Sequence, residues 1–345
     1  MSIRLRYGTL LSIVLVLFQT GHAQDLHFSQ YTNSPLLTNP ANTGFIPDGD
    51  YRLGVNYRNQ WSSVTAFPYK TMSAFGDMQL MKNQEATGWL GLGGLVLRDV
   101  AGASVLTSTK VYGSVAYHQM LGTGSLLSLG FNVGWSNKQI NTQNLSFPSQ
   151  WNGQFFDLHL TGAPVLQTNQ SSYLDLQTGL NYAYFPNDRV WLNGGVSAMH
   201  VNRPRESFFA SNGSASNQLA IRYNGFFNSS FKLNDRWIVS PSAYYTTQAR
   251  ASQVMGSLIA RYNASGDGTT ELLAGVAYRH RESVIPLIGI GLNELVFTFS
   301  YDVTLSGLNA FNGARGAYEF SLIKQGRRDR YQGNGRESMC PSFRY

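Results

Sequence analysis

The chain has 345 residues, which is long enough for two soluble domains or for one large all-β barrel. Only 13% of its residues are charged, while glycine, tyrosine and phenylalanine are abundant, so we expect few helices. The mean hydropathy of -0.19, with no long apolar run after the N-terminus, excludes helical membrane spans. A membrane barrel stays open as a class, because only alternate residues of its strands need be apolar.

The formal net charge of +7 is concentrated near the C-terminus. Residues 324–345 carry +4, and Arg4 and Arg6 supply two more positive charges, so the rest is nearly neutral. This distribution does not indicate a basic face that binds nucleic acid. We interpret residues 324–345 as a basic periplasmic tail. It is either unstructured or a docking element for acidic periplasmic partners that carries Cys340, the single cysteine.

Residues 1–23 have the pattern of a signal peptide. Arg4 and Arg6 form the charged start, Leu10 to Phe18 the apolar core, and Gly21-His-Ala23 the cleavage site. The segment 24–50 that follows is polar and rich in turn residues. We expect it to be a periplasmic lead-in to the barrel, or alternatively a plug that enters the lumen.

Alternation of apolar and polar residues dominates from Tyr51 onward and predicts an all-β transmembrane barrel over residues 51–323. The polar positions are rich in glycine, serine and asparagine, unlike the charged outer face of a soluble sandwich. We expect 14 antiparallel strands, near 51–61, 69–80, 87–98, 104–119, 125–137, 172–185, 190–201, 217–233, 236–249, 252–263, 270–281, 283–291, 294–303 and 316–323. An even number of strands closes the sheet, so that no edge is left unpaired in lipid.

Loop lengths alternate along the predicted strands. Connections after even-numbered strands are short, and the longest connections, 138–171, 202–216 and 304–315, follow odd-numbered strands. This is the pattern of short periplasmic turns and long outer loops. We therefore predict an integral outer-membrane protein with both termini in the periplasm.

The loop over 138–171 is unusually long and rich in aromatic residues. It contains Phe147, Trp151, Phe155 and Phe156. Loops of this length are commonly functional. We interpret it either as a lid over the mouth of the barrel or as part of a surface site for a protein partner.

Two arginines, Arg52 and Arg58, lie on the polar face of the first predicted strand. Facing lipid at mid-depth, each would cost about 2–4 kcal/mol, so we place both in the lumen. Their candidate partners are Asp77, Asp175, Asp302 and Glu319. The resulting network either stabilises the wall alone or contacts a segment inserted into the lumen.

Catalytic chemistry is not indicated. The six histidines are scattered without metal-ligand spacing, and no cofactor motif is present. Ser114 and His118 share one strand face, as a hydrolytic pair would, but no acidic residue stands beside His118. We predict that the protein is not an enzyme and needs no cofactor.

Three blocks near the start of the expected mature chain carry a family resemblance. They are Gln24-Asp-Leu-His-Phe-Ser-Gln-Tyr31, Asn39-Pro-Ala41 and Tyr57-Arg-Asn-Gln-Trp61. In this order they resemble blocks of the PorP/SprF family of Bacteroidota outer-membrane proteins, and Cys340-Pro-Ser-Phe343 is similar to the family's ending. The resemblance implies a role in type IX secretion and gliding. It also implies pairing with a secreted adhesin or other surface protein that has a C-terminal sorting domain.

The resulting hypothesis is a barrel in outer-membrane lipid that binds such a protein and helps to secrete or anchor it. Periplasmic secretion or gliding machinery is a second expected partner, through the basic tail. The candidate partner-binding residues are Phe28, Tyr31, Arg52, Arg58, Phe147, Trp151, Phe155 and Phe156. The alternatives are a channel or porin for small or hydrophobic molecules, and a lipid-modifying enzyme that uses Ser114 and His118.

Overall fold

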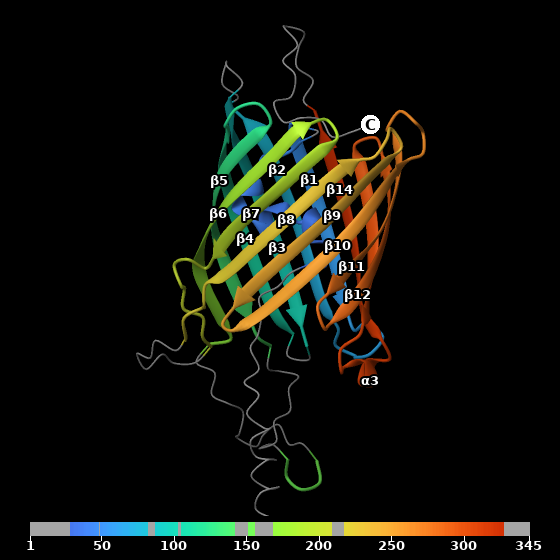
Figure 1. Ribbon diagram of the computed structural model, residues 1–345. Coiled ribbons are helices and arrows are strands. Elements are labelled where there is room, and N and C mark those ends of the chain that lie inside the picture. Colours follow the sequence, from blue (N-terminus) through green and yellow to red (C-terminus); the bar gives the residue numbers. More distant parts are fainter. Residues whose placement is uncertain are drawn as a thin grey trace, which may run out of the picture.

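Fourteen antiparallel strands form one closed barrel in the computed structural model of the chain (Figure 1). The structure describes residues 28–47, 49–81, 87–102, 105–141, 151–155, 168–208 and 217–327. The strands are β1 (Tyr51–Gln60), β2 (Tyr69–Leu80), β3 (Gly88–Ala101), β4 (Leu106–Met120), β5 (Ser125–Gln139), β6 (Gln170–Asn187), β7 (Val190–Met199), β8 (Arg222–Lys232), β9 (Trp237–Gln248), β10 (Ala251–Asn263), β11 (Thr270–Arg279), β12 (Ser283–Leu292), β13 (Leu295–Thr304) and β14 (Arg315–Gly326).

Each strand pairs with its neighbours in sequence, and β1 pairs with β14 to close the sheet. This seam runs without interruption from Tyr51 opposite Gly326 to Gln60 opposite Ala317. The predicted fold class and strand number are therefore confirmed.

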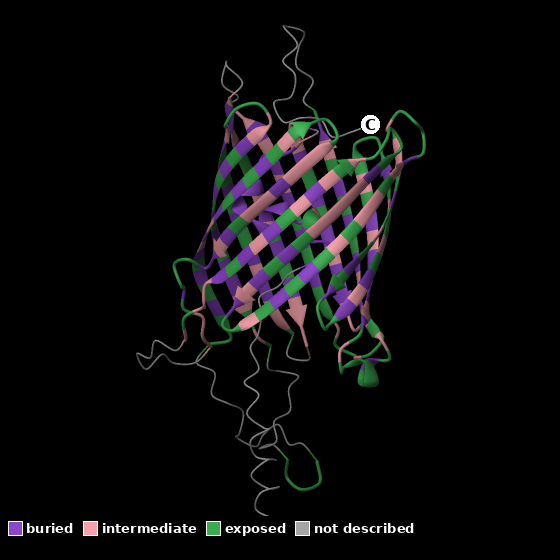
Figure 2. Cartoon of the chain, viewed as in Figure 1, coloured by how far each residue is buried: buried purple, intermediate pink, exposed green. Residues whose placement is uncertain are grey.

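The predicted alternation also decides which side chains face outward. Val55 and Phe131 are 49% and 48% exposed, whereas their neighbours Asn56 and Asn132 are buried. Figure 2 shows this alternation as bands of buried and exposed residues that cross the strands. Apolar side chains thus cover the outer wall, and polar side chains line the lumen, as a barrel in lipid requires.

The two rims of the barrel differ in their connections. At the short-turn end, β6 and β7 are joined by residues 188–189, and β12 and β13 by residues 293–294. At the long-loop end, residues 140–169 join β5 to β6, and the loop between β13 and β14 contains the short helix α3 (Asn309–Asn312). Within the part of the chain that is described, no helix is long and apolar enough to cross a membrane.

Most strand boundaries fall within a few residues of the prediction, but β8 begins at Arg222 instead of residue 217. The preceding residues fold back onto the loop after β7. Leu219 donates its backbone N–H to Pro204, and Glu206 donates to Asn217. This local pairing uses the backbone groups that a longer β8 would have offered to its neighbours.

Three short helices precede β1 and lie inside the barrel. They are η1 (Tyr31–Asn33), α2 (Pro35–Thr38) and η2 (Pro40–Asn42), drawn in dark blue in Figure 1. Proline begins both α2 and η2, where its missing N–H removes no helical hydrogen bond.

Candidate functional site, the filled lumen

Residues 28–47, which we call the plug, occupy the lumen. Phe28, Leu36, Asn39 and Ile46 each keep no more than 2% of their surface exposed. The alternative in which the lead-in segment enters the lumen therefore describes these residues. The barrel wall contacts the plug in three regions, at its first end, in its middle and at its other end.

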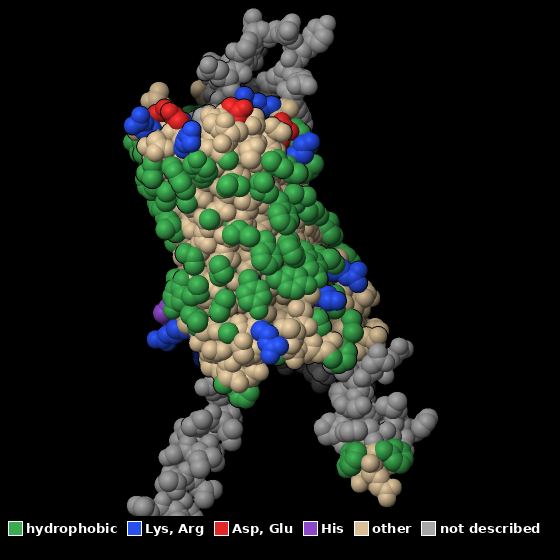
Figure 3. Space-filling model, turned by 90° about the vertical axis from the view of Figure 1, so that its right-hand side faces the viewer, with side chains coloured by type: hydrophobic (Ala, Val, Ile, Leu, Met, Phe, Trp, Pro, Cys, Tyr) green, Lys and Arg blue, Asp and Glu red, His purple; other side chains and the backbone are tan. Residues whose placement is uncertain are grey.

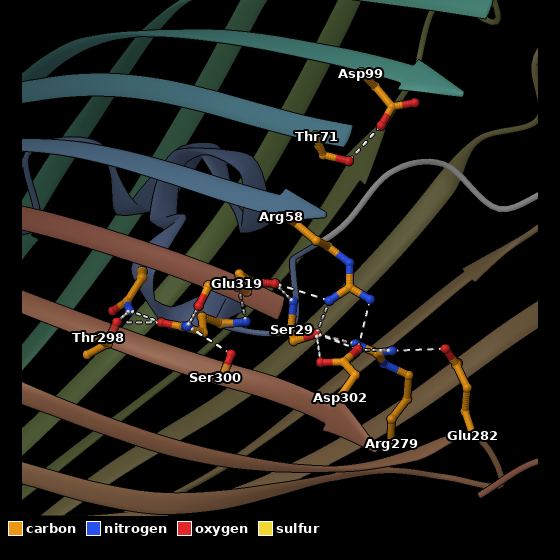
Figure 4. Close-up of polar contacts among 12 residues, drawn as sticks. Ser29, Arg58, Thr71, Asp99, Arg279, Glu282, Thr298, Ser300, Asp302 and Glu319 are labelled. Carbon is orange, nitrogen blue, oxygen red and sulfur yellow. Dashed lines mark hydrogen bonds and ion pairs between the residues drawn. The ribbon is translucent and has the colours of Figure 1, made fainter. Parts of the chain in front are cut away.

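At its first end, the plug is bound by carboxylates of the barrel wall (Figure 4). The backbone N–H groups of Ser29 and Gln30 donate to the carboxylate of Glu319 on β14, at 2.9 and 2.7 Å. The Ser29 hydroxyl donates to Asp302 on β13 at 3.0 Å. We call this set of contacts the outer anchor.

Two arginines balance the charge of these carboxylates. Arg58 pairs with Asp302 at 2.8 Å and with Glu319 at 3.2 Å. Arg279, on β11, pairs with Asp302 at 3.1 Å and with Glu282 at 2.9 Å. Because a buried charge is costly unless it is paired, the two arginines offset the charge of these carboxylates, which also accept hydrogen bonds from the plug.

The middle of the plug packs against strand glycines. Asn39 donates its side-chain amide to the carbonyls of Leu180 and Val196, at 2.9 and 3.1 Å, and accepts from the Ala41 N–H. A Cβ at Gly179 would overlap the Asn39 side chain, and a Cβ at Gly130 would overlap the Pro40–Ala41 backbone. The Asn39-Pro-Ala41 block thus fits a gap that strands β5 and β6 leave open by having no side chain.

The other end of the plug has its own charged contact. Asp77 on β2 pairs with Arg52 at 2.8 Å and accepts the Gly44 backbone N–H at 2.8 Å. Phe45 packs in an apolar cluster with Trp89 and Leu126. We call this set of contacts the inner anchor.

The two anchors lie at opposite ends of the barrel. Arg58 and Asp302 lie two residues from the ends of β1 and β13 at the long-loop end. Trp89 and Leu126 lie one residue from the starts of β3 and β5 at the short-turn end. The plug therefore crosses the lumen from the long-loop end to the short-turn end, where β1 begins.

The predicted lumen positions of the arginines are confirmed, with one exception among their partners. Arg52 pairs with Asp77, and Arg58 with Asp302 and Glu319. Asp175 pairs with neither: it contacts Nδ1 of His200 at 2.8 Å and accepts from Tyr112 at 2.6 Å. The prediction was wrong here because position and register bring Asp175 beside β4 and β7, away from both arginines.

The predicted partner-binding residues fall in different places. Phe28 and Tyr31 lie inside the lumen, where Tyr31 stacks on Tyr244 with ring centroids 4.9 Å apart. Trp151 and Phe155 are 50% and 58% exposed. Phe147 and Phe156 lie outside the described residues. The predicted residues thus form no single cluster.

Ser114 and His118 both hold the plug. Ser114 and Thr43 share a hydrogen bond between their hydroxyls. His118 contacts the Thr43 carbonyl with Nε2 and the Ser128 hydroxyl with Nδ1, both at 2.7 Å. Thr43 thus lies between the two residues that were considered as a hydrolytic pair, and this arrangement favours a structural role for both.

A cavity of about 250 Å³ remains beside the plug. The plug lines it with Tyr31 and Thr38, and strands β8 to β13 line it with both small polar side chains, such as Ser240, and apolar ones, such as Ile259. Trp191, Ile238 and Gln325, near the short-turn end of their strands, also line it. The cavity thus extends along the lumen from Tyr31 toward the short-turn end.

The sequence analysis missed several residues that bind the plug, above all Ser29, Asn39, Thr43 and Arg279. The Phe-Ser-Gln-Tyr and Asn-Pro-Ala blocks carried a signal, because Ser29 and Asn39 lie in them and Thr43 lies two residues after Ala41. Arg279 stands at the end of β11, and only the closed barrel brings it to Ser29, where its Nη2 donates at 2.5 Å.

These features define the class: a transmembrane β-barrel of the outer-membrane type whose lumen is filled by its own N-terminal segment. The chain belongs to the PorP/SprF family. The family model, described as type IX secretion system membrane protein PorP/SprF, matches residues 20–323. The protein is therefore an integral outer-membrane component of type IX secretion.

Solved barrels share the fold at low sequence identity. A Pseudomonas aeruginosa FadL homologue is 11% identical, with 85% of this chain and 94% of that chain covered and a TM-score of 0.52. The Ralstonia pickettii toluene transporter TbuX is 12% identical, with coverages of 89% and 96% and a TM-score of 0.51. The P. putida toluene transporter TodX is 12% identical, with coverages of 86% and 94% and a TM-score of 0.51. No curated protein matches the sequence.

Proposed function

We propose that this barrel is a noncatalytic partner of an exported surface protein, which it binds at the long-loop end and helps to secrete or anchor. The observation that carries the proposal is the plug, because a lumen closed by two buried anchors is poorly suited to free diffusion. Membership of a type IX secretion family supports the exported class of partner. Such a partner is an adhesin with a C-terminal sorting domain, and periplasmic machinery at the short-turn end is a further partner.

The exposed aromatic residues at the long-loop end are the proposed contact surface. Trp151 and Phe155 are half exposed within the longest loop. Exposed tryptophan and phenylalanine side chains bury large apolar areas when a partner covers them. This part of the sequence-based hypothesis is retained as a proposal, whereas the buried Phe28 and Tyr31 would serve the partner only by fixing the plug.

The test is purification from the native outer membrane in mild detergent, followed by mass spectrometry of bound proteins. We expect one large secreted protein with the wild type and less of it with the double variant Trp151→Ala/Phe155→Ala. The matched control is Phe231→Ala/Trp237→Ala, whose exposed side chains lie near the short-turn end. Recovery of the barrel alone from wild-type membranes would contradict the proposal.

The path of the plug also bears on the orientation of the chain. Outer-membrane barrels have short periplasmic turns and long outer loops, so we assign the long-loop end to the cell surface. Ser29 lies at that end and Gly326 at the other. We therefore propose that Phe28, the first described residue, lies at the cell-surface end of the lumen, whereas the sequence analysis expected a periplasmic N-terminus.

Epitope tags test this orientation. A tag inserted after His27 should be labelled on intact cells, whereas a tag after Tyr345 should be labelled only after the outer membrane is permeabilised. Protection of the His27 tag on intact cells would contradict the assignment, and the two tags serve as controls for each other.

A channel for small or hydrophobic molecules is the second candidate. The cavity beside the plug favours it, and the folds similar to this one include two that are described as toluene transporters. This alternative predicts measurable conductance of the purified barrel in planar bilayers. A non-conducting wild type favours the partner function.

A further inference from the structure

Two basic side chains near the long-loop end face outward, toward lipid. Arg98 on β3 shares its outward direction with the exposed Val96, and Lys70 on β2 shares its direction with the exposed Met72. Arg98 pairs in register with Met72, and Lys70 pairs with Val100, two positions farther on. Diagonal neighbours in a sheet lie about 7–8 Å apart, so the two charges are close together.

The wall offers these two cations no carboxylate. In β13, β14, β1, β2 and β3, the carboxylates are Asp77, Asp99, Asp302 and Glu319, and all four are buried on the lumen side. A charge that faces lipid is unfavourable even near the interface, unless a group of opposite charge accompanies it. The described part of this wall therefore supplies no carboxylate on the lipid side to balance the charges of Lys70 and Arg98.

An apolar groove begins beside Arg98 and runs down the outer wall. Its volume is about 400 Å³, and Arg98 is the one charged side chain among the residues that line it. The register places Phe297, Leu322, Val55, Ala74 and Val96 in one row across five strands. Ala74 is the small member of this row and leaves the hollow between its larger neighbours.

The rows change from apolar to polar toward the long-loop end. The next row after Val55 holds Phe320, Tyr57, Met72 and Arg98, and the row beyond it holds Tyr318, Asn59 and Lys70. Asn59 donates its amide to the hydroxyls of Tyr57 and Tyr318, at 3.3 and 2.8 Å. Toward the long-loop end, the outer wall thus changes from an apolar groove to a group of cationic and hydroxyl-bearing side chains. A lipid has the same order of apolar tail and polar head.

The whole long-loop end shows the same excess of positive charge. Its exposed basic side chains, among the described residues, are Lys70, Arg98, Arg203, Arg205, Arg250, Arg281 and Arg315, against the exposed carboxylate of Glu282. The short-turn end is mixed, with Asp188, Asp235, Asp267 and Glu294 beside its basic residues. On the face shown in Figure 3, the upper, short-turn end carries both signs of charge, whereas the charged groups lower down are basic.

From this arrangement we propose that Lys70, Arg98 and the groove below them bind a phosphorylated lipid. The phosphate lies between the two cations, and one acyl chain lies along Val55 and Ala74. A phosphate monoester carries about -1.5 to -2 charges at pH 7. Two cations balance this charge more closely than they balance the charge of a phosphodiester. The phosphorylated glycolipid of an outer-membrane outer leaflet has this chemistry at this end of the barrel.

The experiment uses the full-length barrel in an uncharged detergent and counts bound lipid by native mass spectrometry. The probes are monophosphoryl lipid A, the same lipid without its phosphate, and inorganic phosphate. We expect retention of the phosphorylated lipid only. Lys70→Gln/Arg98→Gln should lower its apparent affinity about tenfold or more, because both charged hydrogen bonds to the phosphate are lost.

Two further variants make the result specific. Ala74→Phe fills the groove from the lipid side and should also weaken binding, although it leaves both cations in place. Arg189→Gln/Arg236→Gln removes two exposed cations at the short-turn end and should leave binding unchanged. Equal binding of the dephosphorylated lipid or of free phosphate, or equal loss in the short-turn control, would overturn the proposal.

Discussion

The plug is packed less closely against one side of the lumen than against the other. Along β3 to β6 the plug lies directly on the wall, where a Cβ at Gly91, Gly130 or Gly179 would overlap its atoms. Along β8 to β13 the first end of the plug also contacts the wall, through Ser29 and Tyr31, but a cavity of about 250 Å³ remains beside it. The same barrel therefore has a packed wall and an open wall.

This contrast distinguishes the contacts that hold the plug in place from the part of the wall that leaves free space beside it. On the packed wall, missing side chains let Asn39 reach strand carbonyls at 2.9 and 3.1 Å. On the open wall, Ser240 and Ser242 line free space. Any ligand or movement within the lumen is more easily accommodated at the open wall, whereas the packed wall and the two anchors hold the plug in place.

The largest expected effect comes from the outer anchor. Asp302→Asn should lower the free energy of unfolding by about 3–5 kcal/mol, because it leaves Arg58 and Arg279 with too little negative charge in a buried site. Denaturant titration in detergent micelles measures this change. Asp235→Asn, which changes the exposed partner of Lys232, should change it by less than about 1 kcal/mol. Similar values for the two variants would show that charge pairing does not hold the plug.

A smaller effect is expected from added bulk on the packed wall. Gly179→Val should cost about 1–3 kcal/mol, because the new side chain overlaps Asn39 and forces the plug away. Gly225→Val is the matched control, since nothing lies within 4 Å of its Cβ. If both variants unfold at the same denaturant concentration, the close contact between plug and packed wall is refuted.

How far the sequence predicts this contrast depends on the range of the interactions. Alternation is local, and it placed Arg52 and Arg58 in the lumen and Val55 on the outer wall. Alternation also predicted the number of strands, because each separate run with a period of two marks one strand. The start of β8 was missed, since pairing of Leu219 with the preceding loop overrides the local pattern.

The contacts of the plug depend on register between strands far apart in sequence. Nothing local indicates that Asn39 fits between Gly179 and Gly195, which lie about 140 and 156 residues further along the chain. For the same reason Asp175 was assigned to the wrong partner, and Arg279 was not assigned to Ser29. The family blocks marked the important segment but did not show what it touches.

Tyr31 lies where the plug meets the open wall, so its hydroxyl tests how strongly the two are joined. Tyr31→Phe keeps the stacking on Tyr244 and removes the hydrogen bond to Asn228, which is 3.0 Å long. We expect a loss of about 0.5–1.5 kcal/mol in the free energy of unfolding. Tyr223→Phe, at an exposed position on the outer wall, should have no measurable effect. A loss as large as that of Asp302→Asn would mean that the open wall is also an anchor.

The smallest effect is expected from filling the cavity itself. Ser240→Phe adds more volume than Gly179→Val but places it in free space, so the free energy of unfolding should change by less than about 1 kcal/mol. The lost hydrogen bond to Ser230, at 2.8 Å, opposes the apolar surface that the ring buries. A cost equal to that of Gly179→Val would mean that the cavity does not accept a side chain, and the two walls would no longer differ.

If conductance is measurable in the wild type and falls in Ser240→Phe, the open wall is the route of the channel alternative. If binding of the secreted partner is unchanged in the same variant, that partner does not depend on the cavity.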